Sequence, residues 1–219
     1  MFQQVHPAVP AAAAPIVRRY HRMERLVNWL LAALIGLGVA GFILLTSQLL
    51  IGLFVALLAV IILRAPVFRK AGTTRLRSTA GPESVLADFR GDTPPILLFQ
   101  WGIAQTIDRR DDTTVYEFAY LFGRRSTTMA VEREPDPTAA SESGESVTIT
   151  VTANDVPWGE YSVTVRPDDA GTTVAIDLAS TRRFDLVSVV QGMVANRYYS
   201  TALEAMGYTL EHRDTSISV

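Results

Sequence analysis

The sequence predicts an α+β protein in which an N-terminal transmembrane helical hairpin precedes an antiparallel sheet packed on a long C-terminal helix. The first observation behind this is an apolar run over residues 26–63 with arginines at both ends. The second is a succession of short alternating segments separated by turn residues, followed by a long pattern at helical spacing. We expect a disordered arm at 1–17, a basic-flanked hairpin at 18–70 and a soluble domain at 71–219.

The apolar run is too long for one membrane crossing. It counts 63 − 26 + 1 = 38 residues, and a straight helix rising about 1.5 Å per residue would be roughly 57 Å long, against a hydrocarbon core of about 30 Å. Thr46-Ser47-Gln48 divides it into spans at 26–45 and 49–63. A cleavable signal peptide fits poorly, because its apolar core would be only about 7–15 residues.

Basic residues flank the run on both sides, and positively charged flanks stay in the cytoplasm. We therefore predict an integral protein of the cell membrane with both termini and the soluble domain cytoplasmic, and with Thr46-Ser47-Gln48 at the outer face. The flanking residues are Arg18, Arg19, Arg22, Arg25, Arg64, Arg69, Lys70, Arg75 and Arg77.

Small residues recur every four positions in both predicted spans. This spacing lets helix backbones approach closely and suits the two arms of a hairpin. In a segment rich in Ala and Gly it can equally arise by chance. The residues are Ala32, Gly36 and Ala40 in the first span and Gly52 and Ala56 in the second.

Composition narrows the function classes. Residues 1–70 carry seven basic residues and one acid, whereas residues 71–219 carry 13 arginines and 21 acids, a net charge of −8. The absence of cysteine excludes disulfides and thiolate chemistry. The histidines His6, His21 and His212 are too scattered for a metal site or a triad, and no Gly-rich phosphate loop occurs. We expect no cofactor, no metal and no nucleic-acid partner, and an enzyme is the least favoured class.

The soluble domain is predicted to begin with a strand and a short helix, which Pro82 opens. Six meandering strands follow, then a helix capped by Asp185 and stopped by Gly207, and a final strand at the sheet edge. The strand ranges are 74–80, about 103–110, 113–122, 126–133, 146–153, 158–166, 172–180 and 208–219, and the helices are 82–90 and 185–206.

Alternation indicates which face of this sheet is buried. Val147, Ile149 and Val151 oppose threonines, so one face forms a core. On the second meander strand this face carries four aromatic residues at period two. They either line a cavity for an apolar ligand, with tyrosine hydroxyls as polar anchors, or form an ordinary core. The candidate cavity residues are Tyr116, Phe118, Tyr120 and Phe122 on the strand, facing Val190, Val194 and Tyr198 on the long helix.

Two pairs of carboxylates and one acidic segment are further candidates for a chemical role. Asp111-Asp112 and Asp168-Asp169 could act as acid/base pairs, but each lies at a predicted turn where Asp bonds its own backbone, and the structural interpretation is favoured. Residues 134–145 are polar and acidic without periodicity, which indicates a mobile loop.

The order of elements resembles the helix-grip fold of START, polyketide cyclase-like (SRPBCC-type) and pollen-allergen-like proteins. Several strings also resemble membrane-anchored proteins of halophilic archaea. The resemblance covers about residues 73–206 and implies a curved sheet enclosing, with the helix, a cavity for lipids, polyketides or other apolar molecules. It transfers no catalytic residue. The strings are Phe99-Gln100-Trp101-Gly102-Ile103-Ala104, 116–125, Arg182-Arg183-Phe184 and 202–208.

The leading functional hypothesis is a membrane-anchored cytoplasmic domain that binds a lipid or another apolar ligand in the cavity between sheet and helix. The alternative is a non-enzymatic interaction or assembly protein whose core is filled by its own side chains. An open cavity lined by the aromatic stripe would favour the first hypothesis, and a packed one the second.

In an up-and-down meander, alternate connections lie at the same end of the sheet. The Arg124-Arg125 turn, the Asn154–Pro157 turn and Arg182-Arg183 should therefore share one end. If the first strand pairs antiparallel with the last meander strand, as the resemblance implies, the chain also enters from the membrane there. Arg124, Arg125, Arg182 and Arg183 would then form a basic rim facing anionic lipid, unless they pair with Glu117, Asp177 or Asp185.

Overall fold

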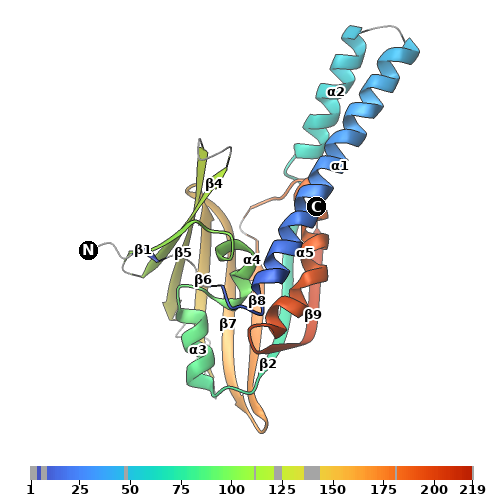
Figure 1. The fold of residues 1–219 in the computed structure, drawn as a ribbon. Helices are drawn as coiled ribbons and strands as arrows, with labels where there is room; N and C mark the ends of the chain where they lie inside the picture. Colours follow the sequence, from blue (N-terminus) through green and yellow to red (C-terminus); the bar gives the residue numbers. More distant parts are fainter. Residues whose placement is uncertain are drawn as a thin grey trace.

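The computed structural model describes residues 4–5, 9–46, 49–110, 112–120, 125–135, 144–180 and 182–218. It confirms the α+β class: a long N-terminal apolar helix precedes a curved antiparallel sheet and a C-terminal helix (Figure 1). The nine strands are ordered β1-β3-β4-β5-β6-β7-β8-β2-β9. They are β1 (Gln4–Val5), β2 (Arg69–Ser78), β3 (Thr106–Arg110), β4 (Thr113–Tyr120), β5 (Arg125–Pro135), β6 (Glu145–Ala153), β7 (Val156–Asp168), β8 (Gly171–Ala179) and β9 (Tyr208–Ser218).

The six predicted meander strands are strands β3 to β8, each antiparallel to the next. The β6–β7 turn holds Asn154 and Asp155 at φ of 49° and 61°, the left-handed conformation that these two residue types tolerate in tight hairpins. Val147, Ile149 and Val151 are buried, as the alternation predicts.

Strand β2 lies between β8 and β9 and is antiparallel to both. The first strand of the domain therefore pairs with the last meander strand, as predicted, and β9 is the predicted edge addition. The register Ala71↔Ala179 brings the start of β2 to the end of β8.

Besides the hairpin, the described residues form four helical segments. Helix α3 (Pro82–Arg90) has Pro at its first turn, and α5 (Leu186–Glu204) begins at Asp185, whose carboxylate accepts the Ser188 N–H at 2.7 Å. After α5 the chain turns at Gly207, whose φ of 86° favours glycine. The 91–102 region forms a 3₁₀ turn, η1 (Pro95–Leu97), and the single-turn α4 (Leu98–Trp101).

The hairpin consists of α1 (Ala14–Thr46) and α2 (Leu49–Arg64). By length and composition Ala14–Leu45 is long and apolar enough to cross a membrane, and Leu49–Arg64 is a shorter apolar helix. The two helices approach closely at Gly52, where an added Cβ would lie 2.1 Å from Ile43 Cγ1, whereas one at Gly36 would meet nothing within 4 Å.

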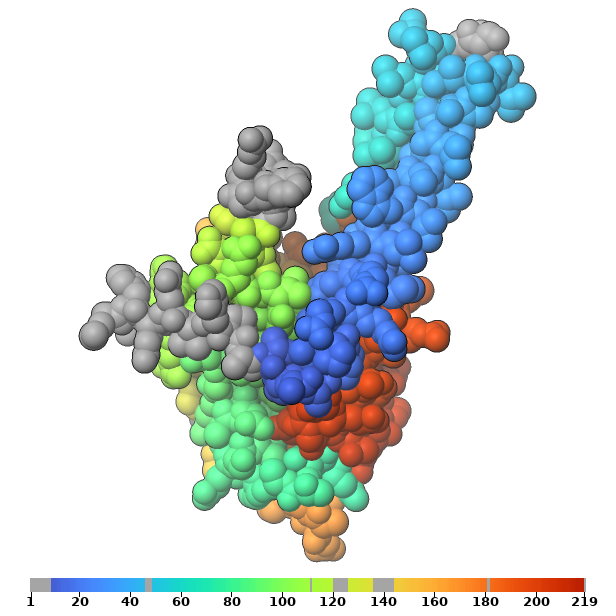
Figure 2. Space-filling view, viewed as in Figure 1, coloured from blue at the N-terminus to red at the C-terminus, as the bar shows by residue number. Residues whose placement is uncertain are grey.

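The first turns of α1 pack against the domain that carries the sheet. We predicted a disordered arm up to residue 17, but α1 begins at Ala14, and Ala13, Val17 and Tyr20 are buried. These positions follow the i, i+4, i+7 spacing of one helix face, so the segment has an apolar stripe to bury. Figure 2 shows this part of α1 seated on the domain while the rest projects from it with α2.

Candidate functional site

The hairpin and the domain meet at the first turns of α5. Phe68, just after α2, forms an isolated antiparallel bridge with Phe184, just before α5. The N–H groups of Val67 and Phe68 both donate to Phe184 O, at 3.1 and 3.0 Å. Because backbone hydrogen bonds hold these two segments together, α2 and α5 are fixed relative to one another.

Lys70 reinforces this junction from beneath α5. Its Nζ donates to Ser188 O at 3.1 Å and lies 4.9 Å from the centroid of the Phe184 ring. Burial lowers the pKa of Lys70, against the opposing influence of the Asp185 carboxylate. A Cβ at position 192 would lie 2.8 Å from this Nζ, so Gly192 makes room for the ammonium group.

Asp185 links the end of α2 to the start of α5. Its Oδ2 lies 3.4 Å from Arg64 Nη1. Burial alone would raise the pKa of Asp185, but the hydrogen bonds from Ser188 and the neighbouring Arg64 bring it below its usual value. The carboxylate therefore caps α5 in its ionised form.

A groove of about 300 Å³ opens where α1, α2 and α5 diverge. One part of the groove wall is apolar and the other part is polar. Apolar side chains from α1 and α2 line one part, while Arg64 and a hydrogen bond from Gln191 Nε2 to Asn28 Oδ1 at 3.1 Å lie at the other. The lining residues are Asn28, Leu31, Ala32, Ile35, Val60, Leu63, Arg64, Val187 and Gln191.

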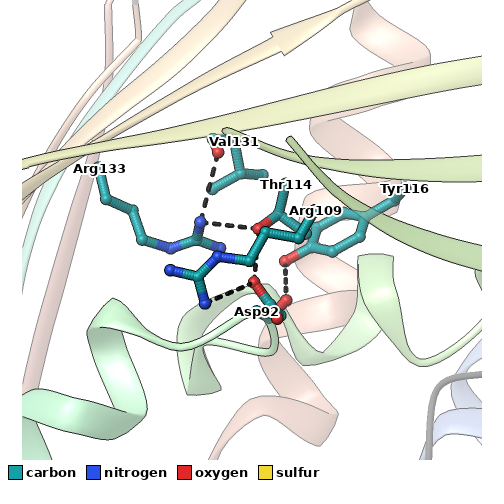
Figure 3. Close-up of polar contacts among 6 residues, drawn as sticks. All are labelled: Asp92, Arg109, Thr114, Tyr116, Val131 and Arg133. Carbon is teal, nitrogen blue, oxygen red and sulfur yellow. Dashed lines mark hydrogen bonds and ion pairs between the residues drawn. The ribbon is translucent and has the colours of Figure 1, made fainter. Parts of the chain in front are cut away.

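Of the predicted cavity residues, the structure gathers several around the core between sheet and α5. Tyr116 is fully buried, and its hydroxyl donates to Asp92 O at 2.7 Å (Figure 3). Burial raises the pKa of this hydroxyl above its usual value. Phe118, Val194 and Tyr198 are partly buried and pack on the same core.

Three predicted cavity residues remain: Val190, Tyr120 and Phe122. Val190 is half-buried on α5. The Tyr120 side chain and all of Phe122 lie outside the described residues. The groove between α1, α2 and α5 is lined by none of the predicted cavity residues.

The predicted basic rim is described in part. Arg182 is half-buried, with its guanidinium 5.1 Å from the Phe184 ring centroid, and Arg183 is exposed. Arg124 and the side chain of Arg125 lie outside the described residues. The strand register places Arg125 and Arg182 at the end where β2 begins, as the meander prediction requires.

The part of the chain that the structure describes contains no group of three or more His, Asp or Glu side chains placed to hold a metal ion. Of the predicted acidic turn pairs, Asp168 lies at the β7–β8 turn. Its Oδ1 accepts the N–H of Asp169 at 2.9 Å, the local capping predicted for this turn. Its Oδ2 pairs with Arg77 Nη2 at 2.9 Å.

Sequence reasoning missed the polar wall of the groove. Asn28 is an amide inside the apolar run, and such residues near a membrane are functional candidates by default. That signal was present in the sequence. The partner, Gln191, could not be inferred, because only the tertiary fold brings α5 to α1.

Comparison with known proteins yields structural neighbours without an assigned activity. No family model matches the chain, and no curated relative matches it. The crystal structure of the Mll3558 protein from Rhizobium loti covers 64% of this chain and 96% of its own, with 16% identity and a TM-score of 0.41. A Rhodobacter sphaeroides protein covers 63% and 90% at 13% identity and a TM-score of 0.38. An uncharacterised Rhizobium leguminosarum protein covers 63% and 98% at 12% identity and a TM-score of 0.35.

Proposed function

We propose that this chain is a membrane-anchored cytoplasmic domain, resembling helix-grip proteins, that binds an amphipathic lipid of its own bilayer. The observation that carries the proposal is the groove between α1, α2 and α5, which joins an apolar surface to a polar one. A lipid has the same two-part chemistry. Both helices of the hairpin cross the membrane in this proposal, with the basic flanks on the cytoplasmic side.

The depth of the groove residues supports this assignment. Trp29 is 76% exposed on α1, and Trp favours the boundary between headgroups and hydrocarbon. Leu31, Ala32 and Ile35 follow it toward the tip of the hairpin, where acyl chains would lie. Asn28 precedes it, level with the headgroups, and Arg64 closes α2 at the other side of the groove.

The polar wall suits a phosphate or ester group. The Arg64 side chain is 69% exposed, and its ion pair with Asp185 is long at 3.4 Å. A guanidinium near anionic lipid contributes about 1 kcal/mol. The amides of Asn28 and Gln191 offer further donors. Half-buried Arg182 and exposed Arg183 extend the same basic end of the domain toward the headgroups.

The interior between the sheet and α5 is the second place where an apolar ligand could bind. Phe118, Val194 and Tyr198 each pack against the hydrophobic core. Truncation of Phe118 to Ala separates the possibilities. Loss of lipid without a large loss of stability would place the ligand in the interior, whereas strong destabilisation with lipid retained would leave the groove as the site.

Lipid retention tests the groove directly. The full chain is reconstituted in nanodiscs of phosphatidylcholine with a minor share of phosphatidylglycerol, and the retained lipid is counted by native mass spectrometry. We expect Ala32→Trp, which fills the groove, to reduce retained phosphatidylglycerol at least fivefold. Ala33→Trp, one position along α1, is the matched control and should retain it.

Equal lipid retention by the Ala32→Trp and Ala33→Trp variants would overturn the groove assignment. A dimer that forms without bound lipid would favour the assembly hypothesis instead. Topology is tested separately, with reporters fused at Met1 and at Val219, which we expect on the cytoplasmic side. Termini on opposite sides would mean a single crossing.

A further inference from the structure

A second polar cluster lies at the other end of the sheet, where the segment after α3 meets strands β3 to β5 (Figure 3). Asp92 follows α3, Arg109 is on β3, Thr114 and Tyr116 are on β4, and Arg133 is on β5. Thr114 Oγ1 donates to Asp92 Oδ1 at 2.8 Å and accepts from Arg133 Nη1 at 2.8 Å. The hydrogen bonds fix the position of Arg133 among residues of the core face.

This cluster holds two guanidinium groups around one carboxylate. Figure 3 shows the two guanidinium groups close together, with Arg109 directed at Asp92 and Arg133 bonded to Thr114 and Val131. The Arg109 Nη1 to Asp92 Oδ1 distance is 3.6 Å, longer than a charge-assisted hydrogen bond. Burial lowers the pKa of Arg133 and the neighbouring Arg109 lowers it further, while Tyr116 and Asp92 act in the opposite sense. Burial is the largest of these influences on the pKa of Arg133, so the main cost of this site is the withdrawal of a guanidinium charge from water.

Arg133 also has donors left over. Its Nε and Nη2 are withdrawn from solvent and have no hydrogen-bond partner among the described residues. These two groups form one edge of the guanidinium fork, the edge that binds two oxygens of a carboxylate or phosphate side by side. Leaving charged donors desolvated and unpaired costs free energy. A ligand that accepts hydrogen bonds from these two groups would remove that cost.

A cavity of about 500 Å³ lies beside this cluster, within the size range of small-molecule sites. Arg109 contributes to both the cavity and the cluster, and Gly91, next to Asp92, forms part of its floor. Arg90 and Glu145 form an ion pair of 3.4 Å at its edge, where Glu145 is 65% exposed. Arg133 itself does not line this cavity, and water does not reach its Nε and Nη2. An oxyanion that enters next to Arg109 therefore reaches this edge only when the Arg109 side chain shifts.

We propose that this cavity binds a small oxyanion, a carboxylate or phosphate group, held between Arg109 and the Nε/Nη2 edge of Arg133. The site is independent of the groove between α1, α2 and α5. The oxyanion can belong to a soluble metabolite or to a lipid headgroup, since both present the same oxygens.

The test uses the full chain in nanodiscs of phosphatidylcholine, with inorganic phosphate as the probe and sodium chloride at equal ionic strength as the reference. We expect phosphate to raise the unfolding temperature in a saturable way. Arg109→Gln and Arg133→Gln should each weaken phosphate binding at least tenfold. Arg110→Gln, the next residue on β3, should bind like the parent.

Two further arms sharpen the result. Arg133→Lys keeps a positive charge but removes the fork, so binding should still fall, which a purely long-range charge effect would not produce. Glycerol phosphate and phosphatidic acid in the nanodisc distinguish a soluble from a lipid source, and binding of either supports the site. Because Arg109 is 57% exposed, Arg109→Gln should fold even if Arg133 variants do not. No saturable shift in the parent, or an undiminished shift in Arg109→Gln, would overturn the proposal.

Discussion

The two halves of α1 are one continuous helix in two different surroundings. In the first half, Val17 and Tyr20 are 2% and 8% exposed. In the second half, Leu37, Leu44 and Leu45 are 71%, 81% and 88% exposed. These outward-facing apolar side chains belong to the stretch that is long and apolar enough to cross a membrane. The difference teaches that this apolar stretch and part of the folded domain are the same secondary-structure element.

The contacts of the first half are specific. The centroid of the Tyr20 ring lies 4.3 Å from that of the Phe99 ring and 6.3 Å from that of the Tyr198 ring. His21 Nε2 lies 3.0 Å from Phe99 O, and its Nδ1 lies 3.0 Å from Glu24 Oε2. Since α1 is tied to both α4 and α5, the domain is held at a fixed angle to the hairpin rather than on a flexible tether.

Among the changes predicted here, truncation of Tyr20 should cause the largest loss of unfolding free energy. Removal of a buried aromatic ring costs about 3–5 kcal/mol of unfolding free energy, because packing is lost and a void remains. We expect Tyr20→Ala to destabilise the domain by that amount in denaturant titrations followed by near-UV circular dichroism. Leu44→Ala, in the exposed half, should leave the titration unchanged. Equal shifts would mean that the first half of α1 does not belong to the domain.

A methyl group added at Gly52 should disturb the packing of α1 on α2, whereas one added at Gly36 should not. A methyl group at Gly52 would overlap Ile43, and overpacking of this kind costs about 1–3 kcal/mol. Gly36→Ala meets nothing within 4 Å and serves as the control. We expect Gly52→Ala alone to lower the midpoint of an SDS titration of helical content. Indistinguishable midpoints would show that the two helices do not pack at Gly52.

The smallest expected effect is at the cap of α5. Asp185→Ala should cost about 1 kcal/mol through loss of the hydrogen bond to Ser188, whereas Asp185→Asn keeps a capping oxygen and should cost less. Because the pKa of Asp185 is below its ordinary 3.8, its contribution is complete above that pH and is lost as pH falls through the lowered value. Denaturant titrations from pH 6 to pH 2 should show this loss in the parent and not in Asp185→Asn.

The sequence patterns predicted most of the fold because alternation and turn residues act locally. The six meander strands, the Asp185 cap and the edge strand are within a few residues of their predicted positions. The helical start of α1 was not predicted, because a Pro- and Ala-rich composition indicates disorder. The spacing of Ala13, Val17 and Tyr20 is nevertheless helical. The groove and the Arg109–Arg133 cluster were not predicted for another reason. Both are formed by residues far apart in the sequence, and a local sequence pattern does not reveal such contacts.

The central position of β2 has a consequence for how the protein is made. Its partners β8 and β9 are synthesised long after it, since Arg69 pairs with Ser218 at the far end of the chain. At about 5–20 residues per second, β2 leaves the ribosome well before either of its neighbours has been synthesised. The nascent strand must therefore wait with both edges open, and its arginines and lone lysine discourage pairing with other chains during that time.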